Sequence, residues 1–201
     1  MKLFLKAGAC SLSPHIVLEE SGLPYETEAV DLKTKVTASG ADYWAINPKG
    51  YVPALQLDSG EVLTEGPAIV QYLADQVPEK KLAPANGTLK RYRLQSWLTF
   101  IGTELHRSFS PFFNPASSDD WKAAALSNLE RRLDYTNTQL AGNSYLLGEE
   151  FSVADAYLFT ILNWAKFIKL DLARWPNVAV YQARVGARPA VQAALKSEGL
   201  A

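Results

Sequence analysis

Residues 1–14 read MKLFLKAGACSLSP, and this stretch decides how the first part of the chain folds. The apolar run at residues 1–6 predicts a first strand, and the small residues that follow it predict a turn. Ser13 is a favourable N-cap and Pro14 suits the first helical position, so we expect a helix next. Cys10 would then lie beside unpaired amides and the positive end of a helix dipole, a setting that favours its thiolate.

Cys10 is the only cysteine in the chain and opens a C-x-x-S pattern that ends at Ser13. This is the redox C-x-x-C pattern with serine in place of the resolving thiol, so Cys10 could hold a mixed disulfide but could not close an internal one. A free cysteine is equally often a small buried hydrophobe. The turn alone leaves both the functional and the packing interpretation open.

Composition describes a globular protein of 201 residues, with 48% hydrophobic and 20% charged residues. The net charge of -1 excludes a broad field that attracts nucleic acid or an anionic membrane. One cysteine suits a reducing compartment, and no segment has the pattern of a signal peptide or membrane span. Cys10, His15 and His106 do not have metal-site spacing, so we expect no metal and a cytoplasmic location.

The first eighty residues alternate between strand and helix signals. The predicted order is strand, helix, strand, irregular connection, hairpin and helix, at residues 1–6, 13–21, 25–30, 31–46, 52–63 and 64–76. Gly22 is placed to stop the first helix. A βαβ unit followed by an antiparallel pair and a helix predicts a small mixed sheet with helices packed against it.

Beyond residue 87 the strand signal disappears, and apolar residues recur at helical spacing. We expect a long helix up to about residue 106, a break at residues 109–115, and a second long helix from Asp119. Shorter helices should follow, the first of them starting at a capping box that joins Ser152 and Asp155. The predicted domains are an α/β domain at 1–80, a linker at 81–87 and an all-helical domain at 88–201.

Five short segments give this pattern a family resemblance. They are KAGACSLS (6–13), NPKGYVPAL (47–55), LTEG (63–66), TELH (103–106) and FSVADAY (151–157). In this order and spacing they resemble the glutathione transferases, in particular the bacterial beta class, over the whole chain. The resemblance implies a thioredoxin-like α/β N-terminal domain, an all-α C-terminal domain, glutathione as co-substrate and a homodimer.

The resemblance also implies a glutathione site on the first domain. Glu65 would meet the amino group of the tripeptide, and the Gly66 amide at a helix N-terminus would meet the adjacent carboxylate. Val52, held before a Pro53 that is cis in the family, would pair its backbone with the cysteinyl unit. Lys35 would meet the glycyl carboxylate. Taken singly, Lys35 and Glu65 would be solvated charges.

In this class the region of Thr103, Glu104 and His106 closes the site, with some contacts from the partner subunit. Thr99 stands where close relatives carry Asn, so a hydroxyl replaces an amide. His106 by itself would be a structural or dipole-stabilising imidazole. The joint placement of these residues favours the functional interpretation, so the resemblance implies that Cys10 and His106 are catalytic. His15 lacks such support, and we assign it a structural role.

Four aromatic residues are candidates for the wall of an electrophile pocket or for the core, namely Phe109, Phe112, Phe113 and Trp164. The implied reaction conjugates glutathione to small hydrophobic electrophiles, with a glutaredoxin-like activity through Cys10. The alternatives are a carrier of hydrophobic ligands, a glutathione-dependent dehalogenase or peroxidase, and an interaction module without turnover. The natural electrophile is left open.

Overall fold

The computed structural model describes all 201 residues, and the chain divides into two compact units. The first unit combines Met1–Ala83 with Ala187–Ala201, and the second holds Pro84–Gly186. The all-helical domain predicted at 88–201 is therefore too long at its C-terminal end. The last helix, α9 (Pro189–Ser197), belongs to the first unit and packs against its first helix, Leu12–Ser21, where the apolar residues of α9 are buried.

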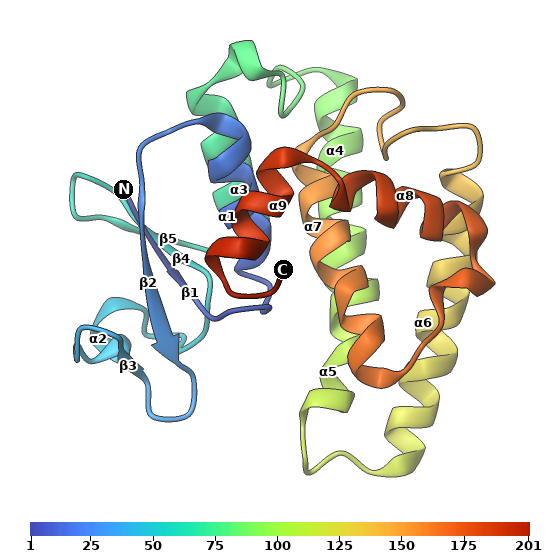
Figure 1. Cartoon of the computed structure of the whole chain (residues 1–201), viewed down its shortest axis with the longest axis horizontal. Coiled ribbons are helices and arrows are strands. Elements are labelled where there is room, and N and C mark those ends of the chain that lie inside the picture. The colour runs from blue at the N-terminus through green and yellow to red at the C-terminus, as the bar shows by residue number, and fades with distance from the viewer. The chain divides into compact units, whose positions relative to one another are not determined.

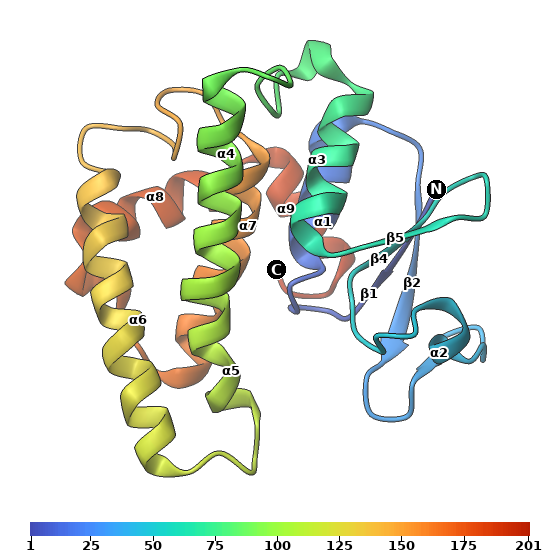
Figure 2. The ribbon, with the colours of Figure 1, turned by 180° about the vertical axis from the view of Figure 1, so that it is seen from behind.

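The first unit contains the predicted mixed sheet, in the strand order β3-β2-β1-β4-β5. The strands are β1 (Lys2–Leu5), β2 (Glu26–Asp31), β3 (Val36–Thr37), β4 (Ala54–Gln56) and β5 (Val62–Thr64). β1 pairs parallel with β2, and every other pairing is antiparallel. Helices α1 (Leu12–Ser21), α3 (Gly66–Gln76) and α9 cover one face of the sheet (Figures 1 and 2).

A second, smaller core holds the segment that precedes β4. Tyr43 is fully buried in the short helix α2 (Tyr43–Ile46), and its ring lies 5.8 Å from that of Phe4 in β1. Val30 and Val52 complete this cluster with Ala54. These apolar contacts fix the position of the backbone around residue 52.

Helix α1 begins two residues earlier than the sequence predicted. Its N-cap is Ser11, whose backbone is already helical, and the hydroxyl of Ser13 is buried without a hydrogen-bond partner. The Ser11 hydroxyl is hydrogen-bonded to the Lys6 backbone and stabilises the turn before the helix. Pro14 lies in the first helical turn, where the missing amide hydrogen removes no hydrogen bond within the helix. Gly22 ends the helix with φ 71°, as predicted.

The second unit is entirely helical. Its α-helices are α4 (Leu89–Phe100), α5 (Arg107–Phe113), α6 (Asp119–Gln139), α7 (Val153–Leu162) and α8 (Pro176–Gly186). All ten residues of α7 are buried, and its N-terminus is held by Asp155, which accepts from the Ser152 amide at 2.8 Å. Tyr181 also donates to Asp155 at 3.0 Å. None of the helices is both long and apolar enough to cross a membrane.

The predicted helix break at residues 109–115 is displaced. Helix α4 continues through a π-helical turn, η2 (Ile101–His106), directly into α5, which ends only at Phe113. Pro111 lies inside α5, where buried contacts of Phe109 and Pro111 itself offset the one lost hydrogen bond. The π turn carries three of the predicted site residues, and such turns are frequent at functional sites.

Candidate functional site

The turn between β1 and α1 holds Cys10 against the backbone of Val52. Cys10 Sγ donates a hydrogen bond to the Val52 carbonyl oxygen at 3.3 Å. Ser11 fixes the turn, since its Oγ lies 3.1 Å from the Lys6 amide and 3.2 Å from the Lys6 carbonyl oxygen. The peptide bond between Val52 and Pro53 is cis. The first unit therefore brings Cys10, Val52 and Pro53 together.

The protonation state of Cys10 differs from the sequence-based expectation. Burial raises the pKa of Cys10 to about 11, and the backbone amides of Cys10 and Ser11 only partly oppose this effect. The predicted thiolate is therefore wrong for the free protein, because desolvation outweighs the helix N-terminus. At neutral pH the residue is a thiol that donates a hydrogen bond.

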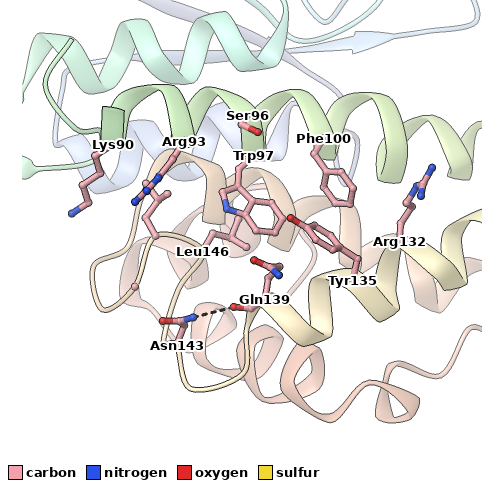
Figure 3. Close-up of a pocket in the computed structure, with 12 residues that line it drawn as sticks. Lys90, Arg93, Ser96, Trp97, Phe100, Arg132, Tyr135, Gln139, Asn143 and Leu146 are labelled. Carbon is pink, nitrogen blue, oxygen red and sulfur yellow. Dashed lines mark hydrogen bonds between the residues drawn. The ribbon is translucent and has the colours of Figure 1, made fainter. Parts of the chain in front are cut away.

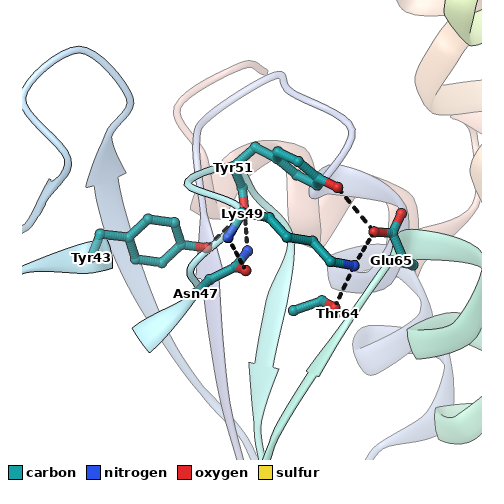
Figure 4. Close-up of polar contacts among 6 residues, drawn as sticks. All are labelled: Tyr43, Asn47, Lys49, Tyr51, Thr64 and Glu65. Atoms are coloured by element: carbon teal, nitrogen blue, oxygen red, sulfur yellow. Dashed lines mark hydrogen bonds and ion pairs between the residues drawn. The ribbon is translucent and has the colours of Figure 1, made fainter. Parts of the chain in front are cut away.

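Glu65 lies at the start of α3 in a cluster of polar side chains (Figure 4). Its Oε1 pairs with Lys49 Nζ and accepts from the Tyr51 hydroxyl at 3.0 Å. Lys49 also donates to the Thr64 hydroxyl at 3.0 Å. These hydrogen bonds, Lys49 first, hold the pKa of Glu65 below its usual range. Glu65 is 53% exposed, so an ionised carboxylate is offered to solvent.

Gly66 contributes the first amide of helix α3, and the next residue, Pro67, has no amide hydrogen. The Glu65 carbonyl accepts from the Ala68 and Ile69 amides, both at 3.0 Å. The Gly66 amide is thus the foremost donor at a helix N-terminus, where anions bind favourably. An ionised carboxylate and the first amide of a helix therefore belong to consecutive residues.

Lys35 reaches the same stretch of backbone from the loop after β2. Its Nζ donates to the Gly50 carbonyl oxygen at 2.6 Å and lies 5.5 Å from the centre of the Trp44 ring. Gly50 has φ 69°, and a Cβ there would overlap the Trp44 ring. Lys35 therefore contacts the segment that precedes Val52 within the same unit.

The residues that support these groups were not predicted from the sequence. Lys49 and Tyr51 hold Glu65, whereas Tyr43 and Asn47 both donate to the Tyr51 carbonyl oxygen, at 3.0 Å and 2.7 Å (Figure 4). All but Tyr43 belong to the motif at residues 47–55, of which only the last part was assigned a role. The sequence feature that could have indicated them is the run of polar side chains just before Pro53.

In the second unit, the residues of the π turn are bound to their own neighbours. Thr103 donates to the Thr99 carbonyl oxygen at 3.0 Å, and both side chains face solvent. Glu104 accepts from Arg132 Nε at 2.6 Å, so this carboxylate is paired with a residue of α6. The sequence did not predict the ion pair to Arg132.

His106 is held by two aromatic residues of the second unit. Its Nδ1 lies 2.7 Å from the Tyr157 hydroxyl, and its ring meets the Trp164 ring edge-on at 4.8 Å. Burial, helped by the positive charge of Arg107, lowers the pKa of His106 to about 4. The imidazole is therefore neutral at pH 7 and offers Nε2 as a donor or acceptor, according to its tautomer.

The candidate electrophile residues fall into two groups. Phe109 is fully buried and belongs to the core, whereas Phe113 is 50% exposed. Trp164 connects them, with ring distances of 5.8 Å to Phe109 and 5.4 Å to Phe113. An apolar patch formed by Phe113, Trp164 and the exposed Phe167 thus lies beside His106.

A separate pocket of about 840 Å³ lies on the second unit, between α4, α6 and the loop after α6 (Figure 3). Three aromatic rings line it, with centre-to-centre distances of 5.2–5.9 Å among Trp97, Phe100 and Tyr135. Basic side chains border these rings, including Arg93 and Arg132. None of the predicted site residues lines this pocket.

Two family models match the chain. Residues 7–76 match the N-terminal domain of glutathione S-transferases, and residues 100–189 match their C-terminal domain. The matched ranges include Cys10, Lys35 and Glu65 in the first model and His106 in the second.

Three solved structures are similar over 100% of both chains. The ternary complex of BphK, a bacterial glutathione transferase, is 60% identical with a TM-score of 0.98. A sphingomonad glutathione S-transferase complexed with glutathione is 51% identical with a TM-score of 0.96. The beta-class glutathione S-transferase of Sphingomonas chungbukensis is 49% identical with a TM-score of 0.97.

Proposed function

The chain belongs to the glutathione S-transferase family, with a beta-class enzyme among its relatives, and from this premise we propose how its own residues bind and activate glutathione. It is a glutathione transferase with glutathione as co-substrate. One observation supports the proposed site best. An ionised Glu65, the Gly66 amide and the Cys10–Val52 contact all belong to the first unit.

The proposed site matches the tripeptide group by group. Glu65 binds the ammonium group, which takes the place of Lys49 as its cationic partner. The Gly66 amide binds the adjacent carboxylate, and Lys35 binds the glycyl carboxylate. The Val52 backbone pairs with the cysteinyl unit, as an added strand would.

Cys10 is proposed to donate a hydrogen bond to the glutathione sulfur after the cysteinyl amide of glutathione has replaced the thiol at the Val52 carbonyl oxygen. Lowering a thiol pKa from about 8.5 to about 6.5 raises its ionised fraction at pH 7 from ~3% to ~75%. The accompanying loss of basicity removes about tenfold of the intrinsic reactivity. The net gain is two- to threefold, so juxtaposition of the reactants must supply more of the rate. We propose that the apolar patch around Trp164, with neutral His106 beside it, binds the electrophile.

The glutaredoxin-like activity stays a prediction, and its rate depends on how much of Cys10 is ionised. In that reaction the Cys10 thiolate attacks a disulfide of glutathione and releases one glutathione thiolate, and a second thiol then reduces the mixed disulfide. Since burial raises the pKa of Cys10, the first step should be slow at neutral pH.

We further propose a homodimer in which the pocket of Figure 3 forms part of the interface. Its partly exposed aromatic rings and arginines are the residue types that dominate protein interfaces. Light scattering during gel filtration tests this, with a dimer mass expected for the wild type and a monomer mass for Trp97→Glu. A cytoplasmic location also stays a prediction.

Calorimetry with reduced glutathione, followed by turnover with a chloronitrobenzene, tests the proposed function. We expect saturable binding and thioether formation. Binding without turnover would favour the carrier. The absence of both binding and turnover would contradict the whole assignment. No structural observation favours the carrier, the dehalogenase or peroxidase, or the interaction module over the transferase.

A further inference from the structure

An exposed aromatic ring and a cation lie side by side on the first unit. Trp44 is 49% exposed, and Lys35 Nζ lies 5.5 Å from the centre of its ring. An ammonium group at this distance is attracted to the face of an aromatic ring, and tryptophan is the strongest partner in such contacts. The pair therefore joins a cation of the proposed site to a residue that has no other assigned role.

The backbone fixes these two residues relative to each other. The Lys35 amide donates to the Asp31 carbonyl oxygen, and the Lys35 carbonyl oxygen accepts from the Tyr43 amide, both at 2.8 Å. Tyr43 directly precedes Trp44 in α2, and the Trp44 amide donates to the Asp42 side chain at 3.0 Å. Lys35 has φ 59°, in the left-handed region that costs energy for a residue with a Cβ. The hydrogen bonds hold this backbone conformation, from which the Lys35 side chain reaches Trp44.

Gly50 provides the surface on which the Trp44 ring packs. Gly50 is buried, and a Cβ on it would overlap the six-membered part of the indole. Its carbonyl oxygen accepts from Lys35 Nζ at 2.6 Å. The ring and the backbone beneath it therefore fix the ammonium group by two contacts, one with the indole and one with the carbonyl oxygen.

The ammonium group keeps donors for a ligand. It has three N–H groups, of which Gly50 takes one, and Lys35 forms no ion pair within the chain. A half-buried cation that is held in place without a carboxylate partner suits an anion that arrives from outside.

We propose that Trp44 is a positioning residue that holds the Lys35 ammonium group ready for the glycyl carboxylate of glutathione. The inference rests on the proposed role of Lys35. A lysine ends in a flexible stem of four carbons, so an ammonium group that the ring already holds loses less conformational entropy when the carboxylate binds. Trp44 thereby makes the site prefer glutathione to a derivative whose glycyl carboxylate is blocked.

Calorimetry with two ligands tests this role. The ligands are reduced glutathione and glutathione monoethyl ester, in which the glycyl carboxylate is esterified. We expect Trp44→Leu to raise the dissociation constant for glutathione about two- to fivefold, the range for a cation–π contact at an exposed site. The same substitution should leave the dissociation constant for the ester unchanged, whereas a general disturbance of the fold would weaken both ligands equally.

Two further variants connect the effect to the contact itself. Trp44→Phe keeps an aromatic face, so its affinity for glutathione should lie between those of the wild type and Trp44→Leu. This variant also provides the test should the leucine variant not fold. In the Lys35→Met background, Trp44→Leu should cause no further loss, because the group that the ring holds is gone.

Trp121→Leu is the matched control, since Trp121 is 50% exposed and lies in the first turn of α6 in the second unit. It should leave the affinity for both ligands unchanged. Weak binding of glutathione by Lys35→Met together with unchanged binding by Trp44→Leu would overturn this inference alone, as would an equal loss for glutathione and the ester in Trp44→Leu. Normal binding by Lys35→Met would refute the proposed role of Lys35 and the inference with it. A wild type that binds no glutathione would refute the proposed function itself.

Discussion

The Cys10 thiol donates its hydrogen bond to the Val52 carbonyl oxygen over 3.3 Å. That bond places a protonated sulfur next to the backbone that we propose to bind the cysteinyl unit of glutathione. Because burial raises the pKa of Cys10 to about 11, the sulfur serves as a donor at neutral pH and becomes a nucleophile only in alkaline solution.

The first prediction concerns this pH dependence. At pH 7 only about one Cys10 in 10,000 is ionised if its pKa is near 11. Alkylation should therefore rise about tenfold per pH unit between pH 7 and 10 without a plateau. Stopped samples analysed by intact mass spectrometry give the rates, and free glutathione serves as the control thiol. A plateau with a midpoint below pH 8 would contradict the assigned pKa.

The second prediction separates the two chemistries of Cys10. Serine keeps a hydroxyl donor at this position, so Cys10→Ser should lower kcat/KM for conjugation by no more than about fivefold, which corresponds to the loss of one hydrogen bond. The same variant should lose disulfide reductase activity completely, since the nucleophile is gone. Parallel assays with a chloronitrobenzene and a glutathione mixed disulfide measure both. Complete loss of both activities would count against this division of roles.

The third prediction concerns Glu65. Glu65→Gln removes the charge that pairs with the ammonium group of glutathione, and hydrogen bonds to charged groups contribute about 1.5–3 kcal/mol. We expect the dissociation constant for glutathione to rise about 10- to 100-fold by calorimetry. Glu61→Gln makes the same charge change on an exposed residue of the hairpin that precedes Glu65 and should leave binding unchanged. Equal affinities in the two variants would remove Glu65 from the site.

Local patterns predicted the sheet and most helices, because the spacing of apolar residues and the positions of glycine are properties of short segments. They did not predict where α9 packs, since an amphipathic helix does not specify which core receives its apolar face. The predicted cap was Ser13, whereas the structure uses Ser11, whose hydroxyl is hydrogen-bonded to the Lys6 backbone across the preceding turn.

The sequence named candidate site residues, but it did not predict their supporting contacts or their protonation states. Glu65 was identified, but Lys49 and Tyr51 were not, because their contact with it depends on how a loop folds back onto α3. The protonation states of Cys10 and His106 depend on burial, which is a tertiary property. From the sequence, only the effect of the helix N-terminus on the Cys10 pKa could be inferred, and burial outweighs that effect.

The fourth prediction concerns His106, whose pKa is lowered to about 4. An unfolded histidine titrates near 6.5, so between pH 6.5 and 4 the unfolded state binds more protons. Stability should therefore fall as pH decreases through this window. The melting temperature of wild type measured at pH 7 and pH 5 should differ more than that of His106→Asn. An imidazole signal of His106 that titrates near pH 6.5 by NMR would contradict this expectation.

The last prediction concerns Gly50, where a Cβ would overlap the Trp44 ring and the backbone has φ 69°. Gly50→Ala must displace either that ring or the carbonyl oxygen that Lys35 contacts, so both stability and glutathione affinity should fall. We expect a loss of about 1–3 kcal/mol in the free energy of unfolding, measured in urea.

Gly60→Ala separates steric overlap from backbone strain. Gly60 also has a positive φ, 91°, but nothing lies within 4 Å of its Cβ position. This control should lose stability through strain alone and keep its affinity for glutathione. Trp44→Leu in the Gly50→Ala background should restore part of the lost stability, because the smaller side chain leaves room for the methyl group. If Gly50→Ala and Gly60→Ala lost the same stability and neither changed affinity, the contact between Gly50 and Trp44 would have no part in positioning the segment before Val52.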